Sequence, residues 1–212
     1  MMKKHLLFIL LSILFVACKK IDDPSPIGNT PLPSHHDPVY KTGDYFRNDT
    51  LEGVVFYTFG EHNGLMVSLE EAQLPWCTTS NINCLTGATN PYDGWNNTNI
   101  VMANYDMIHY PAIKWSYLRN TWHHVHYEHR MITHQQWYVP SSEELSKLLS
   151  NQASVNATLD SLGYPTLEDK TYWSSTELGT RSAATLRMQD STVFVIESAK
   201  DCEFYVRAIR NF

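Results

Sequence analysis

Two apolar stretches near the start of the folded part of the chain have the side chains typical of β-strands. Residues 53–59 (G-V-V-F-Y-T-F) are rich in β-branched and aromatic side chains, and residues 64–68 (G-L-M-V-S) follow across a short polar turn. This pattern predicts a β-hairpin. Near the C-terminus, residues 184–188 alternate, residues 193–196 form a β-branched run, and residues 204–210 (F-Y-V-R-A-I-R) alternate again. The sequence therefore predicts a second hairpin and a final half-buried strand.

The middle of the chain has a helical pattern instead. Helices are expected over residues 98–105 and 111–122, the second with an apolar stripe of Trp115, Leu118 and Trp122. A third helix begins at the capping box Ser141-Ser142-Glu143-Glu144, where the serine oxygen accepts a free helix amide and the glutamate reaches back. Its buried face is predicted to contain three leucines, Leu145, Leu148 and Leu149.

The order hairpin, helices, strands predicts an α+β domain with small antiparallel sheets, two to three helices, and its terminal strands in one sheet. This domain is expected over residues 40–212. Ahead of it, residues 18–39 contain several prolines, which fix φ and remove backbone donors, so this segment is predicted to be an extended tether. The 43% hydrophobic residues of the chain suit a globular fold.

The N-terminus has the layout of a cleavable export signal. Lys3 and Lys4 precede an unbroken apolar run, and F-V-A-C ends at Cys18. The run is shorter than the roughly 20 apolar residues that a membrane-spanning helix needs. The segment resembles a bacterial lipoprotein lipobox, which implies removal of residues 1–17 and acylation of Cys18. The alternative is an uncleaved N-terminal helix that contains a cysteine by coincidence.

The predicted lipid anchor attaches the protein to a membrane, and its location is expected to be the outer membrane. Asp22 and Asp23, just after Cys18, resemble the export signals of surface-displayed lipoproteins of Bacteroidetes. The whole chain has 16 basic and 22 acidic residues, a net charge of −6, which becomes −8 once Lys3 and Lys4 are removed. Nucleic acid is not an expected partner, because its binding relies on dense Lys and Arg.

The remaining cysteines leave two interpretations open. Cys77 and Cys84 would close a short loop around T-T-S-N-I-N as a disulfide, which an oxidising exterior permits. The alternative is that these two and Cys202 are buried free thiols. Cys202 has no nearby histidine to activate it and is not predicted to be a nucleophile.

Three segments occur in a characteristic order: W-Y-V-P-S-S-E-E-L at 137–145, Y-W-S-S-T-E at 172–177 and V-R-A-I-R at 206–210. With the N-terminal hairpin segments, they resemble the DUF1566-type family of secreted Bacteroidetes proteins. That family is related to the C-terminal domain of Legionella collagen-like adhesin and, distantly, to C-type-lectin-like and formylglycine-generating-enzyme folds. The resemblance implies a C-type-lectin-like fold. An enzyme of the formylglycine-generating kind would need a pair of cysteines near the C-terminus, where only Cys202 lies.

A candidate ligand site is predicted where aromatic and amide side chains are dense. The segment N-P-Y-D-G-W-N-N-T-N at 90–99 suits recognition of a glycan or a protein. Convergence of the 90–97 and 172–181 loops on one groove, lined by Trp95, Trp173, Glu177 and Arg181, would define a testable site. The candidate residues are Trp76, Tyr92, Trp95, Asn96, Asn97, Trp173, Glu177 and Arg181. The alternative is that the tryptophans lock loops against the sheet and that 90–99 is a turn-rich loop.

A histidine-rich segment offers a different chemistry. It supplies imidazoles that suit zinc, copper or nickel, although no recognised metal motif is present. The candidate ligands are His123, His124, His126, His129 and His134. The alternative is a polar surface loop.

No catalytic residues and no cofactor are predicted, because no nucleophile elbow, phosphate loop or dinucleotide fingerprint occurs. Three hypotheses follow: a lipid-anchored, non-enzymatic binding module for adhesion or capture, a metal-binding lipoprotein or metalloenzyme, and a structural subunit of a surface fibre or complex.

Overall fold

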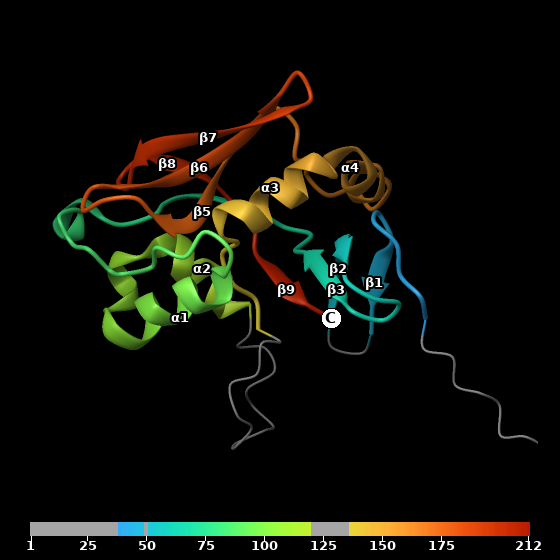
Figure 1. The fold of residues 1–212 in the computed structure, drawn as a ribbon, viewed down its shortest axis with the longest axis horizontal. Coiled ribbons are helices and arrows are strands. Elements are labelled where there is room, and N and C mark those ends of the chain that lie inside the picture. The colour runs from blue at the N-terminus through green and yellow to red at the C-terminus, as the bar shows by residue number, and fades with distance from the viewer. Residues whose placement is uncertain (1–37, 49–50, 120–135) are drawn as a thin grey trace, which may run out of the picture. The chain divides into compact units, whose positions relative to one another are not determined.

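Two β-sheets and four α-helices make up the described part of the chain, which comprises residues 38–48, 51–119 and 136–212 of the computed structural model (Figure 1). By its internal contacts, Asp37–Phe212 is one compact unit. The α+β class predicted from the sequence is confirmed. The predicted signal segment, Cys18 and most of the tether lie outside the described residues.

Sheet A has the strand order β1-β2-β3-β9 and is antiparallel throughout. The predicted N-terminal hairpin is confirmed, with β2 (Glu52–Thr58) paired to β3 (Gly64–Val67). The edges of the sheet are β1 (Tyr45–Arg47) and β9 (Ile209–Asn211), so strands from both ends of the domain share one sheet, as predicted. The rings of Tyr40 and Phe212 also pack edge to face, 5.3 Å apart.

Sheet B has the order β4-β8-β5-β6-β7. Its bounds are Ala72–Pro75 for β4, Glu203–Val206 for β8, Thr171–Glu177 for β5, Ser182–Gln189 for β6 and Thr192–Ala199 for β7. The pairing of β5 with β8 is parallel and the others are antiparallel. The predicted second hairpin is β6–β7, whose turn holds Asp190 and Ser191 at φ 49° and 61°. Positive φ at both turn residues is typical of tight hairpins.

The final strand was predicted as one continuous element, and this prediction is wrong. The chain leaves sheet B after Val206 and enters sheet A at Ile209. Arg207 and Ala208 between them are fully buried. The alternation of the sequence is preserved across this crossing, because both halves are strands, so the pattern alone does not reveal the change of sheet.

The helices are α1 (Gly94–Asn104), α2 (Pro111–Leu118), α3 (Ser142–Ser150) and α4 (Gln152–Ser161), and the fourth was not predicted. Short 3₁₀ turns span Thr79–Asn81 and Met107–His109. Helix α1 begins four residues earlier than predicted, because the Asp93 side chain caps it by accepting a hydrogen bond from the Asn96 amide. None of the helices in the described ranges is long and apolar enough to span a membrane.

The predicted apolar stripe of α2 is wrong as a buried face. Ala112, Ile113 and Ser116 are the buried residues of this helix, whereas Leu118 is 46% exposed. Trp122 lies outside the described residues. The helix packs against β4. The prediction for α3 is confirmed, since Leu145, Leu148 and Leu149 are fully buried.

The core has two main parts. One contains the buried leucines of α3 with apolar residues of β2, β3, β5 and β6, and in Figure 1 α3 lies between the strands of the two sheets. The other gathers α1, α2, Trp76 and Trp173. Each part draws on segments distant in sequence, so the described elements form one cooperative unit.

The predicted capping box of α3 is confirmed and also fixes α1. The Glu144 carboxylate accepts hydrogen bonds from the Ser141 amide at 2.8 Å, the Gly94 amide at 3.0 Å and the Tyr138 hydroxyl at 2.9 Å. Burial raises the pKa of Glu144, and these donors oppose that shift. Two helix N-termini therefore meet at one buried carboxylate.

Replacing Gly94 with alanine is expected to destabilise the fold. A Cβ there would lie 2.4 Å from the Ser141 amide nitrogen, 2.5 Å from the Val139 carbonyl oxygen and 2.6 Å from a Glu144 carboxylate oxygen. Backbone atoms cannot yield cheaply, so we expect a loss of about 2–3 kcal/mol in the free energy of unfolding, measured by chemical denaturation.

The matched control is Gly179→Ala, because its Cβ would meet a movable Ser182 hydroxyl at 2.9 Å. This variant is expected to change stability by less than about 1 kcal/mol. Equal stabilities of the two variants would contradict the close approach of α1 to α3.

Candidate functional site

The 90–97 and 172–181 segments, whose convergence the sequence left open, lie side by side. The Glu177 amide donates to the Ala88 carbonyl at 2.8 Å, the Asn97 side chain donates to the Ser175 hydroxyl at 3.3 Å, and the Thr176 hydroxyl donates to the Asn90 carbonyl at 3.4 Å. The proximity is therefore present, but most of the predicted side chains point inward.

The tryptophans of this region are core residues. Trp76 and Trp173 are fully buried, and their indole nitrogens donate to the carbonyls of Ser174 at 3.1 Å and Leu74 at 3.0 Å. Each indole thus ties two separate segments together. This is the loop-locking role given above as the alternative, and the prediction that these two residues contact a ligand is wrong.

The other predicted residues are divided between core and surface. Asn97 is fully buried and donates to the Asn90 carbonyl at 2.6 Å, so it too is structural. Trp95 and Asn96 are half-buried, with Trp95 packed against the core. Tyr92, which is 72% exposed, and Arg181 are on the surface. Of the candidate residues, Trp76, Asn97, Trp173 and Glu177 are therefore buried, whereas Tyr92 and Arg181 are exposed.

Glu177 was predicted to bind ligand and instead forms a fully buried ion pair. One of its carboxylate oxygens lies 2.5 Å from the Lys200 amine, and neither side chain is exposed to solvent. The carboxylate also accepts the Thr86 and Gly87 amides at 2.9 Å. The prediction fails because every oxygen already has an internal partner.

Lys200 was not identified from the sequence, and it completes this cluster. Its amine donates to the carbonyls of Cys84 and Thr180, both at 3.0 Å, and lies 4.8 Å from the centre of the Trp76 ring. All three ammonium protons therefore have acceptors. Lys200 lies in a polar stretch of sequence, where a lysine normally stays in solvent. Its burial depends on acceptors from other parts of the chain, so the local sequence does not predict it.

The predicted disulfide is not formed. Cys77, Cys84 and Cys202 are free thiols in the structure. The alternative of three buried thiols holds only for Cys77, since Cys84 is half-buried and Cys202 is exposed. The Cys77 and Cys84 sulfurs each approach the carbonyl of the following residue, at 3.3 and 3.7 Å. Burial raises the pKa of the Cys77 thiol to about 11, so it is protonated and unreactive at neutral pH.

The five predicted metal ligands, His123, His124, His126, His129 and His134, lie outside the described residues. Within the described ranges, no group of three or more His, Cys, Asp or Glu side chains is placed to hold a metal ion.

A pocket of about 540 Å³ lies elsewhere, beside sheet A and the end of α2. This volume is within the range of roughly 300–1,000 Å³ that small-molecule sites occupy. The lining residues are Glu52, Ser68, Leu69, Glu70, Trp115, Leu118, Arg119 and Trp137. The sequence does not reveal this pocket, because the spacing of Trp115 and Leu118 predicts a buried helical face.

One wall of the pocket combines a charge pair with an aromatic ring. Both terminal nitrogens of Arg119 donate to one Glu70 carboxylate oxygen, at 2.7 and 2.6 Å. The guanidinium carbon lies 4.3 Å from the centre of the Trp115 ring. The third donor, Arg119 Nε, is buried and has no hydrogen-bond partner in the described part of the chain. Burial lowers the pKa of Arg119, and the Glu70 carboxylate opposes this shift.

Glu52 supplies a second carboxylate to the lining of the pocket. Glu52 accepts the Tyr45 hydroxyl at 2.6 Å, and this hydrogen bond raises the pKa of Tyr45. The two negative charges of Glu52 and Glu70 outnumber the single positive charge of Arg119, so the lining is weakly acidic. Such a lining offers several oxygen acceptors and one guanidinium beside an apolar wall.

Comparison with known proteins gives a likeness of fold and no match of sequence family. No protein-family model matches the sequence, and no curated protein matches it significantly. A crystal structure of a fimbrial protein from Bacteroides ovatus aligns with a TM-score of 0.55 at 21% identity. The match covers 70% of this chain and 36% of that protein, so the chain corresponds to about a third of its length. The likeness concerns the fold alone.

Removing the buried ammonium is expected to be severely destabilising. Lys200→Met leaves the Glu177 carboxylate buried without its counter-charge, which costs about 3–5 kcal/mol in the free energy of unfolding. Because the two groups interact directly, adding Glu177→Gln to this variant should cost less than the sum of the single changes, by about 1–3 kcal/mol. Chemical denaturation of all four proteins measures both values.

Lys114→Met is the control, since Lys114 is exposed on α2 and its loss should change stability by no more than about 0.5 kcal/mol. Additive effects of the Lys200 and Glu177 changes would show that the two side chains are not coupled.

Proposed function

We propose that this chain is a surface-anchored binding module, without enzymatic activity, that recognises a glycan in the pocket beside α2. The observation that carries the proposal is the combination of two carboxylates with a guanidinium stacked on tryptophan, all lining one pocket. A sugar hydroxyl both donates and accepts hydrogen bonds, so adjacent hydroxyls match acceptors such as Glu52 and Glu70 beside a donor such as Arg119.

The charge of the pocket supports a neutral ligand over a phosphorylated one. Two carboxylates face one guanidinium, and a phosphate would be repelled by the excess of negative charge. Trp115 and Leu118, which is 46% exposed, supply apolar surface for the C–H faces of a sugar ring.

The anchor in this proposal is the acylated Cys18, followed by the proline-rich tether, which places the module on the outer membrane. The motif F-V-A-C and the basic residues ahead of it support this location. The C-type-lectin-like assignment and the DUF1566-type resemblance are parts of the same proposal. Their support is the α+β arrangement with the terminal strands in one antiparallel sheet.

The test is binding of the purified protein to an array of neutral and acidic glycans, followed by titration calorimetry with the best ligand. Arg119→Lys keeps the positive charge but loses the planar set of donors, and Glu70→Gln removes an acceptor. Each change is expected to weaken binding by about tenfold or more, equivalent to one charge-assisted hydrogen bond.

The matched control is Arg187→Lys, the same change at an exposed arginine on β6, which should leave binding unchanged. Absence of binding to every glycan tested, or equal affinity of the Arg119 variant and the unmodified protein, would exclude the pocket as a glycan site.

A second candidate function is a structural subunit of a surface fibre. The specific observation that favours it is the likeness of fold to the fimbrial protein from Bacteroides ovatus. That protein is about three times as long as the matched segment, so this chain would correspond to one part of such a subunit.

The fibre hypothesis is tested by affinity purification of the tagged chain from native membranes after mild chemical cross-linking. A fibre subunit is expected to co-purify with a small number of other proteins in fixed ratio and to appear as a ladder of higher masses. Recovery of the chain without any such partner would count against this second function.

A further inference from the structure

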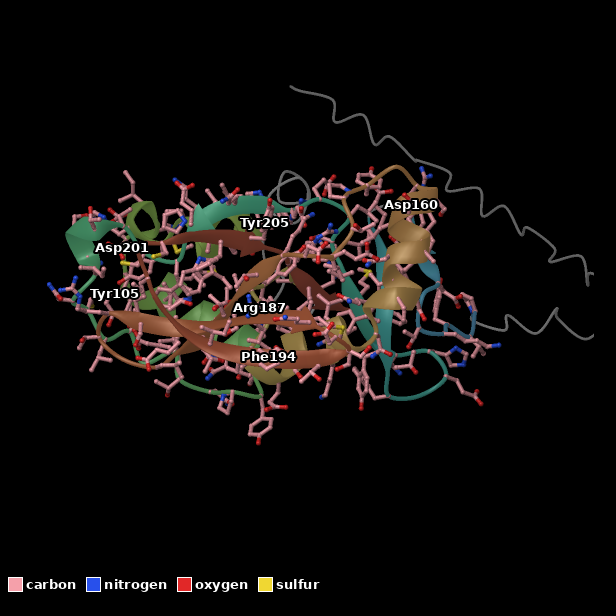
Figure 2. All side chains as sticks on the ribbon, turned by 90° about the horizontal axis from the view of Figure 1, so that it is seen from above. Tyr105, Asp160, Arg187, Phe194, Asp201 and Tyr205 are labelled. Atoms are coloured by element: carbon pink, nitrogen blue, oxygen red, sulfur yellow. The ribbon has the colours of Figure 1, made fainter. Side chains whose placement is uncertain are left out.

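The strand β7 forms an unusually open edge of sheet B. It has eight residues, Thr192–Ala199, and pairs with β6 in continuous register without a bulge. It is the last strand in the sheet order, and Figure 2 shows Phe194 on this edge strand with Arg187 on its neighbour. Phe194 and Val195 are 44% and 61% exposed, and adjacent strand residues point to opposite faces. The edge is therefore apolar on both faces.

The other sheet edges in the described ranges are protected. β1 and β9 have three residues each, and β9 is also covered by a bridge between Ile209 and Tyr138. β4 has four residues and ends at Pro75, which has no amide to donate. Short strands, proline and covering segments are the usual means by which proteins block edge pairing. β7 has none of them, and its one charged residue is Glu197.

The turn of the β6–β7 hairpin determines which backbone groups of β7 point outward. Gln189 and Thr192 flank the two-residue turn and form its closing hydrogen-bonded pair. Because hydrogen-bonded and non-bonded pairs alternate, Phe194 and Ile196 also bond to β6. The amides and carbonyls of Val193, Val195 and Glu197 then point away from the sheet. They lie at alternate positions, as strand addition requires.

We propose that β7 pairs antiparallel with β7 of a second copy of this chain, with Val195 on the two-fold axis. In this register Val195 lies opposite Val195 of the second copy, and Phe194 lies opposite Ile196 of the second copy. The pairing forms about six backbone hydrogen bonds along a strand of about 27 Å, and joins the two five-stranded sheets into one. This interaction does not depend on the glycan pocket.

The side chains of β7 favour a second copy as the occupant. Antiparallel self-pairing places apolar residues against apolar residues, as above, and Thr192 against Ser198. Glu197 lies opposite Val193 of the second copy, so the two glutamates are four residue positions apart, roughly 14 Å, which exceeds the screening length of about 8 Å at physiological salt. No like charges face each other directly. The strand is thus complementary to itself.

A single added strand buries less surface than a standard interface of about 1,600 Å², so the dimer is expected to be weak. Anchoring both copies in one membrane would raise their effective concentration and compensate for low affinity. A measurement in solution must therefore extend to high protein concentration.

The experiment is sedimentation equilibrium of the purified full chain in a density-matched mild detergent, from about 1 μM to about 1 mM. The unmodified protein is expected to change from monomer to dimer in this range. Val195→Lys places a charge on the two-fold axis, and Val195→Pro removes one outward amide without touching the bonds to β6. Both are expected to weaken dimerisation by at least tenfold, and circular dichroism checks that they are folded.

The matched control is Leu85→Lys, which introduces the same charge at a residue that is 57% exposed and distant from β7 in sequence. This variant should dimerise like the unmodified protein. A chain that stays monomeric at the highest concentration, a dimer that persists in both Val195 variants, or an equal loss in the Leu85 variant would each overturn the proposal.

Discussion

The buried guanidinium of Arg207 is the interaction on which the arrangement of the two sheets depends. The chain crosses from sheet B to sheet A at this residue, inside the protein. Its side chain donates to the Ser68 and Leu69 carbonyls at 2.8 Å, to the Pro165 carbonyl, and to the Glu71 carboxylate at 3.1 Å. A buried cation without such partners costs several kcal/mol, so the crossing is stable only while these segments stay in place.

This constraint also positions the candidate site. Glu71 accepts hydrogen bonds from Tyr172 at 2.7 Å and from Lys170 at 2.5 Å, which fixes the segment after β3 against β5. Glu70, whose side chain lines the pocket, lies between these fixed positions. Arg207 holds the carbonyls of residues 68 and 69 before it and the carboxylate of residue 71 after it. The backbone on both sides of Glu70 is held by buried charges. The pocket therefore has one rigid wall, although it lies at the surface.

Local features of the fold were predictable from the sequence, and long-range polar contacts were not. The hairpins and the capping box follow from residues a few positions apart, whose spacing determines their structure. Arg207 and Glu71 are 136 residues apart, and Lys200 and Glu177 are 23 apart. A lysine or arginine in a polar stretch normally stays in solvent, so burial becomes evident only when the fold supplies its acceptors. The crossing between sheets was missed for the same reason.

The candidate site was misplaced because aromatic side chains serve the core and a binding surface equally well. A core residue and a ligand-binding residue differ in the hydrogen-bond partners of their polar groups. The indole donors of Trp76 and Trp173 are bonded to backbone carbonyls of neighbouring segments, so these rings have no polar group left for a ligand. Arg119 keeps an unsatisfied donor beside a pocket with free volume. The α2 pocket thus differs from the 90–97 region in combining free volume with charged and aromatic side chains, and this difference is the reason for placing the proposed ligand there.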